Sequence, residues 1–213
     1  MRTLTILLVT LVVLTALSAA QLRQQSPLQP GRPVPGTEIP VEGVVHWVVN
    51  PAFAPRSLEE LVKEADVIVD GVVESQLPSR LEDPRQPTSI ETDVILEVTN
   101  VLKGRSQDLR KLVIAEVGGK FGNVEVVPTQ YALLQPGERH ILFLNPDRRT
   151  IVPSYTGVDG NFIIVGVWSG NFKVESNNSI TPSPRVVRSL RNYNGVPADT
   201  FVSQILGVLG NSR

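Results

Sequence analysis

The 213-residue sequence contains no cysteine. Without thiols the chain cannot form disulfides, thiolate metal sites, a cysteine nucleophile or a lipid-modified cysteine after an export signal. An exported domain of this size does not need disulfides, because an apolar core is enough to stabilise it. The absence is therefore typical of a bacterial secreted or periplasmic protein rather than of an animal extracellular module.

Histidine is scarce, with His46 and His140 as the only two. They form no H-x-H or H-E-x-x-H arrangement, which excludes a histidine-rich metal site. His46 lies in the apolar run 44–49 beside Trp47, and both are predicted to be packed residues; the alternatives are a ligand for His46 and a sugar platform for Trp47. His140 lies at the edge of an apolar strand and is predicted to be structural.

An excess of charge of either sign is also missing. Arg2 is the only charge in the first twenty residues, so the rest of the chain has 19 basic and 21 acidic residues, a net charge of −2. A duplex-binding protein normally carries a basic field that displaces counterions. Nucleic acid is therefore not an expected partner.

Long apolar runs are confined to the N-terminus. Arg2 precedes an almost unbroken apolar run at 4–17, and Ser18-Ala19-Ala20 supplies the small residues that a signal peptidase reads. We predict a signal peptide at 1–20, cleaved after Ala20, and hence a secreted, periplasmic or cell-envelope protein. The alternative is an uncleaved N-terminal anchor. No later segment approaches the roughly 20 apolar residues that a membrane span needs.

Residues 21–43 contain five prolines and almost no large apolar residue. Proline fixes φ and removes backbone donors, so this stretch is predicted to be an extended linker that holds the domain off a surface. The alternative is a disordered remnant without a role. The remaining residues, 44–213, are expected to form a single domain.

The most informative stretch is 89–104, SIETDVILEVTNVLKG. A period of two puts aliphatic residues and threonine on one face, and on the other, predicted to lie near water, Glu91, Asp93, Glu97 and Thr99, with Ile95 among them. The stretch is long for a strand. Such a strand can bend across a small barrel or sandwich and pair with several neighbours.

Other patterns complete the expected fold. Helices are predicted at 57–65, with a Ser57/Glu60 capping box, and at 198–209, between Pro197 and Gly210. Further strands are predicted at 44–49, 66–75 with a bulge at Gly71, 111–117, 124–134, 139–145, 151–155, 162–168 and 172–175. Connections are too short for crossover helices, so the strands should be antiparallel. The predicted fold is mainly β, an antiparallel barrel or sandwich with an aliphatic interior and two short helices as lids.

The order of these pieces resembles a widespread group of uncharacterised bacterial exported proteins, which share the patterns ADxVVxGxV, TxxxxxVxxVLKG, PGExxLLFL and GxFxV. The corresponding pieces here are ADVIVDGVV, TDVILEVTNVLKG, PGERHILFL and SGNFKV, within residues 56–175. The first two also look like the netrin-like and metalloproteinase-inhibitor type of OB barrel. That resemblance implies a barrel of five or more strands with a helix packed on it. Inhibitory members reach the protease zinc through an N-terminal cysteine, which this chain lacks, so their mechanism does not carry over.

Chemistry-bearing residues are few. Glu91, Asp93 and Glu97 could form a carboxylate pair or a cation site, but we favour alternation on a solvent face as the explanation. The cluster 118–122 lacks phosphate-loop spacing and is predicted to be a flexible or bulged connection. Three further features are read as a turn, a chance glycosylation pattern and solvated charge: Asp159-Gly160-Asn161, Asn177-Asn178-Ser179, and Arg185 with Arg188 and Arg191.

The sequence therefore favours a non-catalytic exported binding or interaction module with no assigned catalytic, cofactor or metal residue. Its expected partner is another protein or a cell-envelope component. One alternative is an envelope hydrolase or hydrolase inhibitor that uses Glu91, Asp93 or the loops 77–88 and 118–122. The other is a subunit of a surface assembly in which 44–49 adds a strand to a neighbour, with homo-oligomerisation left open.

Overall fold

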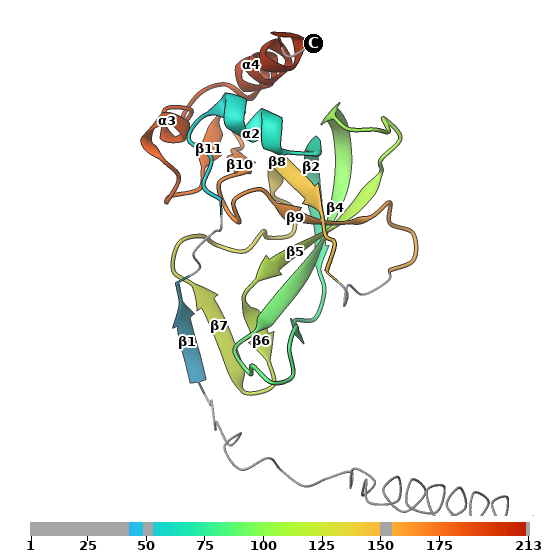
Figure 1. Cartoon of the computed structure of the whole chain (residues 1–213), viewed down its shortest axis with the longest axis vertical. Helices are drawn as coiled ribbons and strands as arrows, with labels where there is room; N and C mark the ends of the chain where they lie inside the picture. Colours follow the sequence, from blue (N-terminus) through green and yellow to red (C-terminus); the bar gives the residue numbers. More distant parts are fainter. Residues whose placement is uncertain (1–42, 49–52, 150–154, 212–213) are drawn as a thin grey trace, which may run out of the picture. The chain divides into compact units, whose positions relative to one another are not determined.

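The computed structural model describes residues 43–48, 53–149 and 155–211 (Figure 1). The predicted signal peptide at 1–20, all but the last residue of the predicted linker and four of the five residues of the predicted strand 151–155 lie outside the described residues. Within the described part, no helix is both long and apolar enough to cross a membrane.

Five strands close into a barrel (Figure 1). These strands are β2 (Val67–Gln76), β4 (Ile90–Lys103), β5 (Lys111–Val117), β8 (Arg139–Pro146) and β9 (Asn161–Ile164). Around the barrel the order is β8, β2, β4, β5 and β9, and β9 pairs again with β8. All pairs are antiparallel except β5 with β9, which is parallel. The predicted mainly β fold is confirmed, and the closed barrel is consistent with an OB-like barrel.

The barrel interior is made by the apolar face that the alternation predicted. On β4 the residues Val94, Leu96 and Val98 point inward, where they meet aliphatic residues of the other barrel strands. β2 bends at Gly71, where its pairing with β4 shifts register, as the bulge prediction expected. A Cβ at Gly71 would lie 2.6 Å from the Glu97 carbonyl oxygen, so only glycine fits at this point of the β2–β4 pairing.

A second core lies on the outer face of the barrel wall. Phe143 of β8 and Phe172 pack there against Phe201, and helices cover them. The elements around this core are α2 (Leu58–Glu64), α3 (Arg188–Arg191), α4 (Ala198–Asn211), β10 (Asn171–Val174) and β11 (Ile180–Pro182). The helices therefore pack on the outside and do not cap the barrel interior as lids. The reason is that β8 is apolar on both faces and needs cover on each.

Helix ends differ slightly from the predictions. Ser57 caps α2 by accepting from the Glu60 N–H at 3.3 Å. The Glu60 carboxylate accepts instead from the Arg56 N–H at 2.7 Å, so the reciprocal half of the predicted capping box is displaced by one residue. α4 continues through Gly210 to Asn211, beyond the predicted end.

A small separate sheet contains β1 (Gly43–Trp47), β7 (Val124–Pro128) and β6 (Gly119–Phe121), in the order β1-β7-β6. β1 runs parallel to β7, so antiparallel pairing is not universal. The cluster 118–122, predicted to be a connection, contains β6. Positive φ angles at Gly118 and Gly119 allow the chain to leave β5 here.

Three predicted segments have other bounds in the structure. The extended segment predicted at 124–134, in which Pro128 implied an edge or a break, is a strand only up to Pro128. The loop predicted at 77–88 contains the short strand β3 (Arg80–Leu81), which pairs with β4. The strand predicted at 162–168 ends at Ile164, and turns follow up to Gly170, with Val167 at φ 64°. Apolar residues there are buried in the outer core by a turn, which the alternation pattern does not distinguish from a strand.

Candidate binding site

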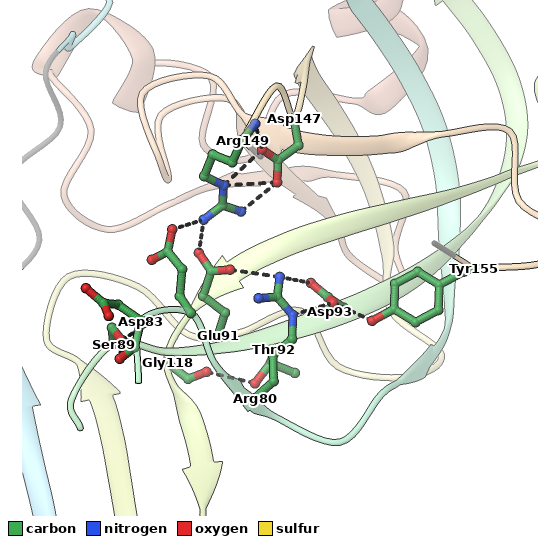
Figure 2. Close-up of polar contacts among 11 residues, drawn as sticks. Arg80, Asp83, Ser89, Glu91, Thr92, Asp93, Gly118, Asp147, Arg149 and Tyr155 are labelled. Atoms are coloured by element: carbon green, nitrogen blue, oxygen red, sulfur yellow. Dashed lines mark hydrogen bonds and ion pairs between the residues drawn. The ribbon is translucent and has the colours of Figure 1, made fainter. Parts of the chain in front are cut away.

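Glu91 and Asp93 are buried, against the prediction that they face water. Their exposed fractions are 3% and 2%. They point to the outer face of β4, opposite the inward-facing Val94, as the alternation requires. However, Arg80, from the strand β3 that pairs beside β4, and Arg149 extend their side chains against that face (Figure 2). The polar face of the strand is thus covered by other parts of the chain.

Arg80 joins the two carboxylates. Its Nη2 lies 2.9 Å from Glu91 Oε2, and its Nε lies 3.0 Å from Asp93 Oδ2 (Figure 2). The Arg80 side chain is itself only 20% exposed. A planar guanidinium can donate to two carboxylates at once, which lysine could not do with this geometry.

Arg149 continues the network on the other side of Glu91. It pairs with Glu91, with Glu82 at 2.7 Å and with Asp147 at 2.6 Å. Although burial alone would raise the pKa of Asp147, the bonds from Arg149 hold it below its usual value. For Glu91 burial has the larger effect and raises the pKa, while Arg149 and Arg80 oppose the rise.

Tyr155 completes the cluster by donating from its hydroxyl to Asp93 Oδ2 at 2.6 Å. Burial, together with this bond to a carboxylate, raises the pKa of Tyr155 to about 12. Each carboxylate in the cluster therefore accepts from an arginine, and Asp93 also accepts from a tyrosine. Glu91 and Asp93 are therefore both occupied by partners from the same chain.

Two adjoining hollows lie beside this network. One, of about 540 Å³, is bordered by the loop 82–89 and Arg149. The other, of about 450 Å³, is bordered by Trp47 and Val48 at the end of β1 and by Glu91. Glu82, Gln86 and Ser89 line both. We call the joined hollows the Trp47 groove, lined by Trp47, Glu82, Asp83, Gln86, Ser89 and Arg149, among others.

The loop that forms one wall of the groove is held by its own hydrogen bonds. Ser89, 8% exposed, ends the loop and ties it together: its hydroxyl contacts the carbonyl oxygens of Asp83 and Gln86 at 3.0 and 2.7 Å and accepts from the Asp83 N–H at 2.9 Å. Backbone bonds from Glu82 to Ser89 and from Gln86 to Asp83 close the turn. These hydrogen bonds fix the loop, so this wall of the groove is pre-formed.

The groove changes the interpretation of the run 44–49. His46 is exposed, so the prediction that it is packed is wrong. Trp47 is half-buried, belongs to neither hydrophobic core and lines the groove, so the prediction that it is a core residue is also wrong. Both differ because β1 is an edge strand of the small sheet, whereas the prediction assumed a strand packed on the domain.

His140 lies apart from the groove. It is 3% exposed, with Nδ1 2.7 Å from Asn171 Oδ1 and Nε2 3.3 Å from Glu138. Burial lowers the pKa of His140, although bonds to Asn171 and Glu138 oppose this. Glu138 is paired in turn with Lys173 at 2.6 Å. The contacts describe a buried, hydrogen-bonded residue, in keeping with the structural role that was expected.

Glu116 was not singled out from the sequence. It lies on β5 with the same parity as the inward-facing Leu112 and Ile114, and Oε2 accepts from the Leu134 N–H at 2.8 Å. Oε1 has no hydrogen-bond partner among the described residues. Burial, reinforced by the charge of Glu138, raises the pKa of Glu116 to about 8, although the Leu134 bond opposes the rise. The sequence signal that could have identified Glu116 is its position as the one acidic residue on the apolar face of the strand 111–117.

The remaining candidates are dispersed. Asp159 accepts from the backbone N–H groups of Arg110 and Lys111, and Asn177 accepts from Ser179 at 2.7 Å. The three arginines of 185–191 are exposed, and two of them lie in α3. Within residues 43–48, 53–149 and 155–211, no three His, Asp or Glu side chains converge as they would around a metal ion.

Comparison with known proteins finds neither a matching family model nor a matching curated sequence. The resemblance to bacterial exported proteins therefore stays a prediction.

Proposed function

We propose that the chain is a non-catalytic exported binding module that attaches to a cell-envelope component through the Trp47 groove. The observation that carries this proposal is the contrast between the groove and the buried carboxylates next to it. Glu91 and Asp93 are occupied by Arg80, Arg149 and Tyr155, while the groove beside them is open and has a pre-formed wall. Its volume lies in the range of ligand sites, about 300–1,000 Å³.

The same proposal includes export of the chain. It also includes the assignment of the barrel to the netrin-like type. The apolar run after Arg2 and the small residues before Gln21 support export. N-terminal sequencing of the protein recovered outside the cytoplasm should begin at Gln21. A chain that retains Met1 would contradict cleavage.

Binding to the envelope can be tested with the mature chain, residues 21–213, carrying a fluorescent label. It is mixed with the envelope fraction of the cells that produce it, sedimented, and the bound fraction is measured against concentration. The variant Gln86→Trp fills the groove from an exposed position that lines both hollows. We expect it to weaken binding at least about tenfold, which corresponds to about 1.4 kcal/mol.

Gln204→Trp is the matched control, since Gln204 is an exposed glutamine of α4 outside the groove. It should bind like the wild type. Equal binding by the wild type and by both variants would contradict the use of the groove. No sedimentation of the wild type at all would contradict envelope attachment.

A second candidate, a subunit of a surface assembly, is favoured by the free edge of β1. Gly43 N–H and Trp47 C=O both bond toward β7, at 3.1 and 3.0 Å. In a parallel pair the backbone groups of alternate residues point to opposite sides, so those of Val44 and His46 point away from β7. Among the described residues no strand pairs with this edge. An added strand from another chain would find these groups available.

Sedimentation equilibrium of the mature chain tests this candidate. Self-association through β1 should raise the mass with concentration, and His46→Pro, which removes an outward N–H, should lower the association. A monomer mass at all concentrations would exclude homo-assembly.

A further inference from the structure

We propose that the Trp47 groove takes a neutral oligosaccharide, with one sugar ring against Trp47 and hydroxyl groups bonded to Gln86 and to the acidic side chains Glu82 and Asp83. The inference rests on the proposed function and names its ligand class.

The charges that border the groove argue for a neutral ligand. The hollow beside the loop has two acidic and two basic residues, Glu82, Asp83, Arg85 and Arg149. Glu82 and Arg149 pair at 2.7 Å, and Asp83 lies 3.6 Å from Arg85. A charged ligand of either sign would meet like charges on this border, Glu82 and Asp83 for an anion and Arg85 and Arg149 for a cation, so the border favours neither sign. A ligand that is rich in hydroxyl groups can instead donate to carboxylate oxygens that stay paired on their other side.

Gln86 supplies the neutral polar group. Its side chain is exposed and has no hydrogen-bond partner among the described residues, while its backbone is fixed by the turn. An amide offers two donors and an acceptor, which matches a hydroxyl that both donates and accepts. Because the loop is pre-formed, binding would cost little backbone ordering.

The two tryptophans of the chain show how Trp47 differs from a packed aromatic residue. Trp168 is 7% exposed and stacks on Tyr131 with ring centroids 5.8 Å apart. Trp47 is half-buried, has no aromatic partner of that kind among the described residues, and borders a hollow. An indole in this position offers an apolar face and an N–H at once, which suits the C–H face and the hydroxyl edge of a pyranose.

The probes are a neutral β-1,4-linked hexamer of N-acetylglucosamine, a neutral β-1,4-linked hexamer of glucose, and an anionic hexamer of galacturonic acid. Binding to the mature chain is measured by calorimetry and by acrylamide quenching of tryptophan fluorescence. A neutral hexamer should bind and protect Trp47, whereas the buried Trp168 should be poorly quenched with or without sugar.

Trp47→Ala and Gln86→Glu should each weaken binding of the neutral hexamer at least about tenfold, with Gln204→Glu, at an exposed glutamine outside the groove, unchanged. Gln86→Glu changes an exposed loop residue and keeps the fold, so it stays informative if loss of Trp47 loosens β1. Absence of binding for both neutral hexamers at about 1 mM, or tighter binding of the anionic hexamer, would overturn the ligand class. If groove-dependent sedimentation with the envelope persists in that case, the proposed function stands and only its ligand class falls.

Discussion

The two halves of β4 have the same alternating pattern but different surroundings. In the first half, Glu91 and Asp93 are 3% and 2% exposed and are held by arginines. In the second half, Glu97 and Thr99 occupy equivalent positions and are exposed. The difference shows that a polar face on a strand predicts where side chains point and not whether water reaches them. Cover by the side chains of Arg80 and Arg149 decides that.

Removing the cover from the first half should have the largest effect. Arg80→Ala leaves two buried carboxylates without their shared partner, and we expect a loss of about 2–3 kcal/mol in the free energy of unfolding, measured by urea denaturation. The value lies at the low end for buried pairs because Arg80 is partly open to water. Arg85→Ala on the neighbouring loop is the control, because Arg85 is 92% exposed and should change stability by less than about 0.5 kcal/mol. Equal effects would show that the network is only a surface feature.

The pairing of Gly71 of β2 with the second half of β4 tests packing instead of charge. Gly71→Ala would place a Cβ 2.6 Å from the Glu97 carbonyl oxygen, a backbone atom that cannot move aside freely. We expect a loss of about 2 kcal/mol in the same measurement. Gly104→Ala, whose Cβ would meet its nearest neighbour at 3.4 Å, serves as the control and should be close to neutral. A neutral Gly71→Ala would mean that the bulge can relax.

Glu116 lies on the inward face of the barrel wall, across from Thr92, whereas Glu91, the neighbour of Thr92, lies on the outer face. The two glutamates therefore allow the two faces of the wall to be compared. In the folded chain the pKa of Glu116 is raised to about 8, above its ordinary value of 4.5. The folded state therefore keeps a proton that the unfolded state loses, and stability should fall as pH rises from about 4.5 to 8. We expect a slope of about 1 kcal/mol per pH unit, below the limit of about 1.4.

Glu116→Gln removes that titration. The difference in free energy of unfolding between variant and wild type should be small at pH 5 and should grow in favour of the variant toward pH 8. Parallel pH profiles for the two proteins would contradict the raised pKa.

The exposed half of β4 should respond least. Glu97→Ala removes a carboxylate that points to water, and the free energy of unfolding should change by less than about 0.5 kcal/mol. A loss comparable to that of Arg80→Ala would erase the contrast between the two halves.

Local sequence signals predicted most of the fold correctly. The long strand, the helix capped by Ser57, the bulge at Gly71 and the apolar strand β8 all follow from spacing and from turn residues, which act over a few neighbours. The candidate site was not predictable in the same way. Arg80 and Arg149 are 69 residues apart in the numbering, and nothing in either local pattern says that both reach Glu91.

The prediction for Trp47 was wrong for a related reason. An apolar run predicts burial, but an edge strand buries only part of its surface, and the pairing of β1 with β7 is a long-range event. One sequence signal pointed away from the core: the apolar run is short, ends at Asn50-Pro51 and is separated along the chain from the barrel strands.

By itself the sequence determined most strand and helix segments, the inward face of β4 and the lack of thiol chemistry, because periodicity and composition are local properties of the chain. Only the tertiary structure decided that Glu91 and Asp93 are buried, that Trp47 borders a groove and that the Glu116 side chain is buried on the inward face of β5. Burial and charge pairing depend on which distant segments cover a face, and no short stretch of residues specifies that.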